Sequence, residues 1–159
     1  MALGVQPGDR LGIWAPNCAE WCITQFASAK VGAILVNINP AYRSSELDYA
    51  LGQSGCRWVI CADAFKTSDY HAMLLGLVPG LAGGQPGALI CERFPELRGV
   101  VSLAAAPPPG FLAWHDLQAR AVAISREALA ERQAQLHCDD PINICLLYTS
   151  DAADDSLRV

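Results

Sequence analysis

A strand, a helix and a second strand are predicted by residues 11–36, LGIWAPNCAEWCITQFASAKVGAILV. The apolar run Leu11–Trp14 is typical of a buried strand, and Pro16 stops it because proline cannot continue a sheet. The apolar run 33–36 is the second strand. Two strands joined through a helix must lie parallel, so this segment predicts a parallel crossover.

The helix inside this segment has its own start and stop signals. We expect Asn17 to cap its first turn, with Glu20 three residues later completing a capping box. Residues 21–29 are apolar on much of the helix circumference, and Gly32 follows the last turn. A helix this apolar is expected to be covered by other elements.

The same alternation continues along the chain. We expect Ser44 or Ser45 to cap a second helix, in which Leu47, Ala50 and Leu51 recur at helical spacing. The apolar runs and helical stretches that follow predict strands at 58–61 and 99–103, helices at 70–78 and 125–135, and a strand that begins at 142. Repeated strand–helix alternation predicts an α/β fold with a doubly wound, mostly parallel sheet.

Composition and charge exclude several classes of protein. The chain has 159 residues, which is typical of one domain, and only 17% of them are charged against roughly 25% in an average soluble domain. The net charge is −5 and the basic residues are scattered singly, so we expect no nucleic-acid partner. There is neither an apolar run of about 18 residues nor a signal-peptide pattern at the start. We therefore expect no membrane span and a cytoplasmic location.

The cysteines favour reduced, packed thiols over a disulfide framework, because their number is odd and most lie in apolar runs. Cys18 and Cys22 are four residues apart on one helix, a spacing that can chelate a metal, but no second pair completes a tetrahedral site. We therefore expect them to pack. The seven are Cys18, Cys22, Cys56, Cys61, Cys91, Cys138 and Cys145.

Other polar patterns offer no active site. The glycine-rich segment Gly80–Gly87 lacks a following Lys-Ser/Thr and a strand directly before it, so we interpret it as a flexible surface loop rather than a phosphate cradle. The histidines are far apart in sequence and no Gly-x-Ser-x-Gly elbow is present. We expect no catalytic, cofactor-binding or metal role for His71, His115 and His137, for Glu46 and Asp48, which do not share a helix face, or for Asp139 and Asp140, which precede a proline in a turn.

Several short runs of the sequence together carry a likeness to a known family. They are residues 4–10, 14–17, 20–21, 32–43, 46–47, 53–55 and 139–144. These runs resemble the amino-terminal domain of acyl-CoA synthetases of the adenylate-forming (AMP-binding) superfamily, and the likeness spans nearly all of residues 4–144. The central run GAILVNINPAYR is similar to the version found in medium- and long-chain fatty-acyl-CoA ligases.

The resemblance implies a reaction that uses ATP and Mg²⁺ to convert a fatty acid to its acyl-adenylate and then passes the acyl group to coenzyme A. In the family, a phosphate-binding loop of the form Thr-Ser-Gly-Thr-Thr-Gly-x-Pro-Lys is expected just after Ile144. Here Tyr148-Thr149-Ser150 matches its opening, but Asp151 stands in place of glycine and no lysine follows. A carboxylate there repels phosphates. We therefore assign no catalytic, cofactor-binding or metal residue to this chain, and no cofactor to the chain by itself.

The segment Asn39-Pro40-Ala41-Tyr42 lies where a predicted strand ends, near the edge at which open α/β sheets bind ligands. Two interpretations stay open for it. It either shapes a turn, which we favour, or touches the substrate directly.

Residues 145–159, CLLYTSDAADDSLRV, resemble one reading frame of the transposase-end adapter used in sequencing libraries. The alternative is a genuine polar tail. The resemblance implies a natural portion at 1–144, a partial AMP-binding amino-terminal domain, and a non-native tail at 145–159. We also expect the parent protein, the longer enzyme of which this chain would be a part, to begin before Met1.

Two hypotheses follow for function. In the first, the chain is an inactive fragment of an ATP-dependent fatty-acid–CoA ligase of bacterial cytosolic type. In the second, it is a standalone α/β binding module without catalysis. Acyl chain length and oligomeric state are left open by the sequence.

Overall fold

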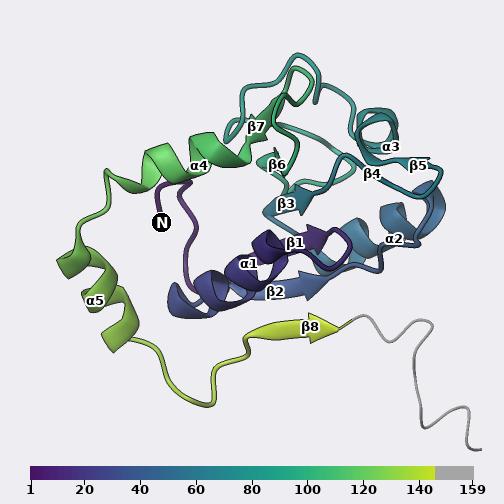
Figure 1. Cartoon of the computed structure of the whole chain (residues 1–159). Coiled ribbons are helices and arrows are strands. Elements are labelled where there is room, and N and C mark those ends of the chain that lie inside the picture. Colours follow the sequence, from purple (N-terminus) through teal and green to yellow (C-terminus); the bar gives the residue numbers. More distant parts are fainter. Residues whose placement is uncertain (146–159) are drawn as a thin grey trace, which may run out of the picture.

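In the computed structural model, which describes residues 1–145, six strands form one parallel sheet (Figure 1). Their order across the sheet is β7-β6-β3-β1-β2-β8. The strands are β1 (Arg10–Trp14), β2 (Ile34–Asn37), β3 (Trp58–Cys61), β6 (Gly99–Ser102), β7 (Phe111–Ala113) and β8 (Asn143–Cys145), and the helices are α1 (Ala19–Lys30), α2 (Ser44–Ser54), α3 (Tyr70–Leu77), α4 (Trp114–Ala121) and α5 (Arg126–Ala134).

The core follows the three central strands. Strand β1 pairs in parallel with β2 on one side and β3 on the other, so that Ile13 lies between Asn37 and Ile60. Ile13 and Val59 are completely buried. Near-continuous apolar strands of this kind are expected where helices cover both faces of a parallel sheet.

The helices do cover both faces, which confirms the doubly wound α/β fold. The chain runs from β1 through α1 to β2 and then returns through α2 to β3 on the far side of β1. Because such crossovers are right-handed, this reversal places α1 and α2 on opposite faces (Figure 1). Helix α3 packs against α2, and α4 lies on the face of α1.

The predicted cap of α1 is wrong. The helix begins at Ala19, its N-cap is Cys18 without a side-chain capping bond, and Asn17 lies exposed outside the helix. In α2 neither predicted serine is the cap, because Arg43 is the N-cap and the carboxylate of Glu46 accepts its backbone N–H at 2.7 Å. The cap of α1 therefore lies one residue later than predicted, at Cys18, whose backbone is extended.

Two parts of the fold are absent from the prediction. One is the hairpin of β4 (Ala64–Phe65) and β5 (Ser68–Asp69), whose strands have only two residues each. The other is β7 with α4, where strand passes directly into helix at Trp114 and no turn residue marks the boundary. The predicted helix at 125–135 is α5, capped by the Ser125 hydroxyl.

The glycine-rich segment lies at the surface, where most of its residues are exposed, and is anchored to the fold at a few points. Leu81 and Leu89 are buried, and Gly87 N–H donates to the carbonyl of Arg98 just before β6. Gly110 lies against the carbonyl of Leu81 with a φ of +88°, and a Cβ built there would be 1.8 Å from that oxygen. The segment therefore lies at the amino ends of the strands, on the edge of the sheet opposite to their carboxyl ends.

Candidate functional site

Four strands end in polar or aromatic groups at the carboxyl edge of the sheet. Strand β1 ends at Trp14, β2 at Asn37, β3 at Cys61 and β6 at Ser102. Open α/β sheets bind ligands at this edge, and it is here that the order of the strands reverses around β1. The carboxyl edge is therefore the candidate site.

The segment after β2 forms the predicted turn at this edge. The side-chain oxygen of Asn39 accepts the N–H of Ala41 at 2.9 Å, and the Asn39 carbonyl accepts the N–H of Tyr42 at 3.0 Å. Tyr42 is buried behind the turn. An Asx-type bond of this sort fixes the turn locally.

Two stacked aromatic rings hold the turn against β1. The rings of Trp14 and Tyr70 have centroids 3.5 Å apart and planes within 10°. The Trp14 Nε1–H donates to the Asn39 carbonyl at 3.1 Å, and the Tyr70 hydroxyl donates to the Pro40 carbonyl at 2.5 Å. Burial raises the pKa of Tyr70 to about 12. The shape of the turn thus depends on Trp14 and Tyr70, which lie far from it in the sequence. Trp14 is 25 positions from Asn39, and Tyr70 is 30 positions from Pro40.

A histidine and a serine meet further along the edge. His71, at the start of α3, has its Nε2 2.8 Å from the Ser102 hydroxyl, and its ring lies 4.9 Å from that of Phe111. Ser102 is fully buried and also accepts the N–H of Ala104. A hydroxyl so enclosed positions His71 and β6 but is not accessible as a nucleophile. No sequence pattern links these two residues, which are 31 positions apart.

The carboxylates close to this edge serve as backbone acceptors. Asp69 caps α3 by accepting the N–H of Ala72, and Asp63 accepts the N–H of Ala64. The Arg43 guanidinium reaches the Thr67 hydroxyl at 3.4 Å, which links the start of α2 to the β4–β5 hairpin. These groups fix the local backbone.

Asn37 stands out because the oxygen of its side-chain amide lacks a hydrogen-bond donor among the described residues. It ends β2, in register with Ile13 of β1 and Cys145 of β8. Its Oδ1 is buried and accepts no hydrogen bond from the part of the chain that the structure describes. A buried acceptor without a donor costs about 1–3 kcal/mol.

The remaining candidates from the sequence lie apart from one another. Asp48 pairs with Arg93, His115 lies beside Asp116 on the surface, and Asp140 accepts the N–H of His137 in the predicted turn. Cys56, Cys61 and Cys91 are buried as expected. The expectation that Cys18 and Cys22 both pack is wrong for Cys22, which is exposed, as are Cys138 and Cys145. Within residues 1–145, no group of three or more His, Cys, Asp or Glu is arranged to hold a metal ion.

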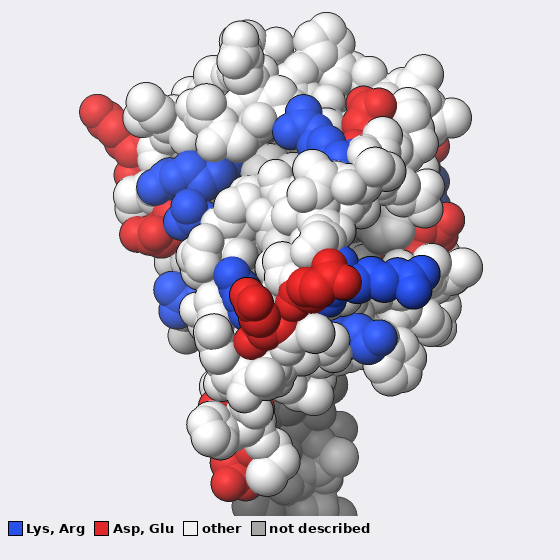
Figure 2. Space-filling view, turned by 90° about the vertical axis from the view of Figure 1, so that its left-hand side faces the viewer, with Lys and Arg blue, Asp and Glu red and all other residues white. Residues whose placement is uncertain are grey.

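Charges of both signs are mixed on the face shown in Figure 2, where Lys and Arg stand beside Asp and Glu. No helix in the described part of the chain is long and apolar enough to cross a bilayer.

The family model described as "AMP-binding enzyme" matches residues 1–150. The chain belongs to this family. The mitochondrial medium-chain acyl-CoA ligase ACSF2 of Mus musculus is 44% identical over 145 residues, and that of Homo sapiens is 40% identical over the same number. Each alignment covers 91% of this chain and 23% of the relative. The chain thus spans about a quarter of the length of these ligases.

Solved structures agree on the fold. The anthranilate CoA ligase AuaEII, in complex with anthranoyl-AMP, matches 89% of this chain and 23% of its own with a TM-score of 0.58 at 23% identity. The apo structure of MbtA from Mycobacterium smegmatis matches 72% of this chain and 18% of its own with a TM-score of 0.55 at 26% identity. The α/β architecture is therefore that of adenylate-forming enzymes.

The expected cytoplasmic location is wrong by this comparison. The mouse, rat and human relatives are all named as mitochondrial proteins. The expectation rested on the residues at the amino-terminal end, and in a chain that spans a quarter of its relatives those residues carry no information on where the whole protein resides.

Proposed function

We propose that the parent of this chain is an acyl-CoA ligase that acts on medium-chain fatty acids. The observation that carries the proposal is 40–44% identity, across nine-tenths of this chain, to mouse and human enzymes named as medium-chain acyl-CoA ligases. A fatty-acid carboxylate attacks the α-phosphorus of ATP and pyrophosphate leaves. The thiol of coenzyme A then attacks the acyl carbon and AMP leaves.

Within this scheme the described residues build the frame of the site. The carboxyl edge fixes the ends of β1, β2 and β6 through the Trp14–Tyr70 stack and the His71–Ser102 pair. Mg²⁺, when bound, would neutralise part of the negative charge on the phosphates of ATP. Residues 1–145 hold no acidic cluster that fits it, so no step is assigned to them through the metal.

The experiment is ATP-dependent release of pyrophosphate by the full-length parent with fatty acids of 4 to 16 carbons and with benzoate. We expect turnover that requires coenzyme A for completion and is highest at medium chain length. Activity confined to benzoate would place the parent in another class of acid–thiol ligase. Absence of pyrophosphate release with every acid would overturn the proposal.

We also propose that the 159-residue chain itself is inactive and that its natural portion is 1–144, with 145–159 derived from adapter DNA. The family match extends to residue 150, and the next residue, Asp151, stands where the resemblance implies a glycine of the phosphate-binding loop. Genomic sequence that diverges after codon 144 is expected. Unbroken genomic sequence through Val159 would contradict the junction, and nucleotide binding by the isolated chain would instead favour the standalone module.

A further inference from the structure

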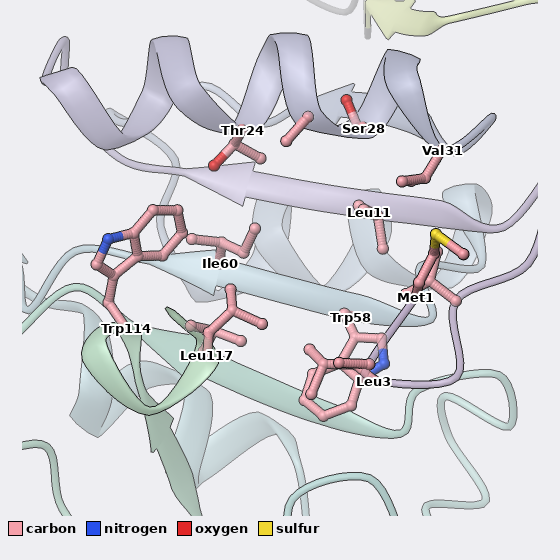
Figure 3. Close-up of a pocket in the computed structure, with 14 residues that line it drawn as sticks. Met1, Leu3, Leu11, Thr24, Ser28, Val31, Trp58, Ile60, Trp114 and Leu117 are labelled. Atoms are coloured by element: carbon pink, nitrogen blue, oxygen red, sulfur yellow. The ribbon is translucent and has the colours of Figure 1, made fainter. Parts of the chain in front are cut away.

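Helix α1 turns polar side chains toward the sheet and apolar side chains toward solvent. Figure 3 shows Thr24 and Ser28 on the side of the helix that faces the sheet, and the two residues are 4% and 2% exposed. The hydroxyl of Thr24 donates to the Glu20 carbonyl at 2.7 Å, and that of Ser28 donates to the Gln25 carbonyl at 3.0 Å. Because both donors are satisfied within the helix, these residues are buried without an unpaired hydroxyl proton.

The outward side of α1 carries four apolar residues, Ala19, Cys22, Ile23 and Phe26, which we call the α1 stripe. All four are exposed, Ile23 by 51% and Phe26 by 72%. Their spacing of three and four residues places them on one face of the helix. The sequence predicts a covered helix, but residues 1–145 leave this face open. A contiguous apolar face of this kind is typical of a site of protein association.

The α1 stripe is complementary to a second copy of itself. When two α1 helices lie antiparallel about a two-fold axis between Ile23 and Phe26, each Phe26 packs against Ile23 of the other copy. The same axis places Lys30, at the end of one helix, opposite Ala19 at the start of the other, because the two positions are equally far from the axis. Large side chains meet in the middle, and the small Ala19 leaves room for a lysine chain at each end. A self-complementary contact of this type closes a dimer.

The charges at the two ends of α1 favour the antiparallel arrangement. The helix has the acidic residue Glu20 in its first turn and the basic residue Lys30 in its last turn. Neither side chain forms an ion pair within residues 1–145. In the antiparallel pair each Lys30 reaches the end of the other helix where Glu20 lies, so opposite charges meet twice. A parallel pair would instead bring like charges together at both ends.

We propose that two copies of this chain associate through the α1 stripe as an antiparallel, two-fold dimer. The contact joins one helix from each copy, so it is small and belongs to the weak, reversible class of protein interfaces. The proposal concerns the 159-residue chain and does not rest on the proposed ligase activity.

Sedimentation velocity of the 159-residue chain, from about 1 to 500 µM and under reducing conditions, tests the association. We expect a reversible equilibrium between monomer and dimer. Phe26→Glu places a charge in the middle of the contact and should raise the dissociation constant at least about 30-fold, the effect of losing one central aromatic side chain. Ile90→Glu, at an 87% exposed position outside α1, is the matched control and should leave the dissociation constant unchanged.

A charge exchange tests the direction of the two helices. Glu20→Lys and Lys30→Glu each place like charges at both ends of the antiparallel pair, so each variant alone should dimerise about 2- to 10-fold more weakly at low ionic strength. An equimolar mixture of the two variants has opposite charges at both ends and should form a heterodimer about as tightly as the unmodified chain forms its dimer.

Three results would overturn the proposal. One is a dimer that Phe26→Glu does not weaken, and another is a mixture of the charge variants that associates no more tightly than either variant alone. The third is a monomer at every concentration, which would leave the α1 stripe to the part of the parent that this chain lacks. The last two results do not depend on whether Phe26→Glu folds.

Discussion

Tyr70 joins three parts of the carboxyl edge, because it starts α3, stacks on Trp14 of β1 and donates to the Pro40 carbonyl after β2. Tyr70→Phe keeps the ring and removes the hydroxyl. It leaves the Pro40 carbonyl without its donor and should lower the free energy of unfolding by about 1–3 kcal/mol. Urea unfolding followed by circular dichroism measures this. An unchanged midpoint would show that the hydroxyl bond adds nothing.

The same residue makes a pH prediction. Burial raises the pKa of Tyr70 from an ordinary value of 10.0 to about 12, so the folded state favours the neutral phenol. Its contribution to stability is therefore complete below pH 10 and is lost as the pH rises from 10 toward 12. Between pH 8 and pH 11, the free energy of unfolding should fall less in Tyr70→Phe than in the unmodified chain. Equal losses would contradict the prediction.

Gly110 is the position where a side chain is least tolerated. A Cβ there would overlap the Leu81 carbonyl, and the φ of +88° is itself unfavourable for other residues. Gly110→Ala should destabilise the fold by about 3 kcal/mol. The matched control is Gly52→Ala in α2, where nothing lies within 4 Å and alanine should add about 0.5–1 kcal/mol of stability. Thermal melting of both variants tests the contrast, and a melting temperature of Gly110→Ala at or above that of the unmodified chain would contradict it.

Among the elements, α5 is held in place mainly by one of its arginines and by a leucine that follows the helix. The helix has no buried residue, yet the Arg132 guanidinium donates to the carbonyls of Val31 and Val5 at 3.3 and 3.4 Å and to the Gln6 side chain at 3.2 Å. Leu136, just after the helix, fills the space left by the missing side chain of Gly32. The helix is therefore fastened to the amino edge of the sheet.

Arg132→Met should release α5 while leaving the sheet intact. We expect amide exchange in α5 to become faster and total stability to fall by about 1 kcal/mol, since half-buried hydrogen bonds of this kind are individually modest. Arg126→Met, on the exposed first turn of the same helix, is the control and should leave exchange unchanged. Equal exchange in the two variants would show that Arg132 does not hold the helix.

The elements with strong local patterns were predictable, and those defined by distant contacts were not. The strands β1, β2 and β3 follow from their apolar runs, and the helix α2 follows from its helical spacing. The hairpin β4–β5 and strand β7 are too short to give a periodic signal. At the candidate edge, the turn at Asn39 was predictable from its own residues. The partners Tyr70 and Ser102 were not, because tertiary folding alone brings them there.

At the scale of the whole molecule, the most direct ionic contact among residues 1–145 joins α2 to the segment that precedes β6. The Arg93 guanidinium binds both carboxylate oxygens of Asp48 and holds the pKa of that carboxyl below its ordinary value. The contribution to stability is present above the unfolded pKa of Asp48 and is lost as the pH falls through the lower folded value. The pair is largely exposed, so its effect is small and weakens with salt.

Arg93→Gln should therefore lower stability slightly at pH 7 and low ionic strength, and the difference from the unmodified chain should vanish in strong acid. Urea midpoints at pH 7 and near pH 2 measure the two ends of this range. Arg120→Gln, on α4 and without an ion pair to a described carboxylate, should show no such pH-dependent difference. A difference for Arg93→Gln that persisted in acid would point to packing rather than charge.

The stacked rings place one of the four tryptophans of the chain, Trp14, at the carboxyl edge in contact with Tyr70. At a centroid separation of 3.5 Å, light absorbed by the phenol passes efficiently to the indole, and the indole emission reports on the turn to which both rings are hydrogen-bonded. In a longer enzyme built on this frame, a shift of that turn on nucleotide or acyl binding would register as a change in tryptophan fluorescence, without any attached dye.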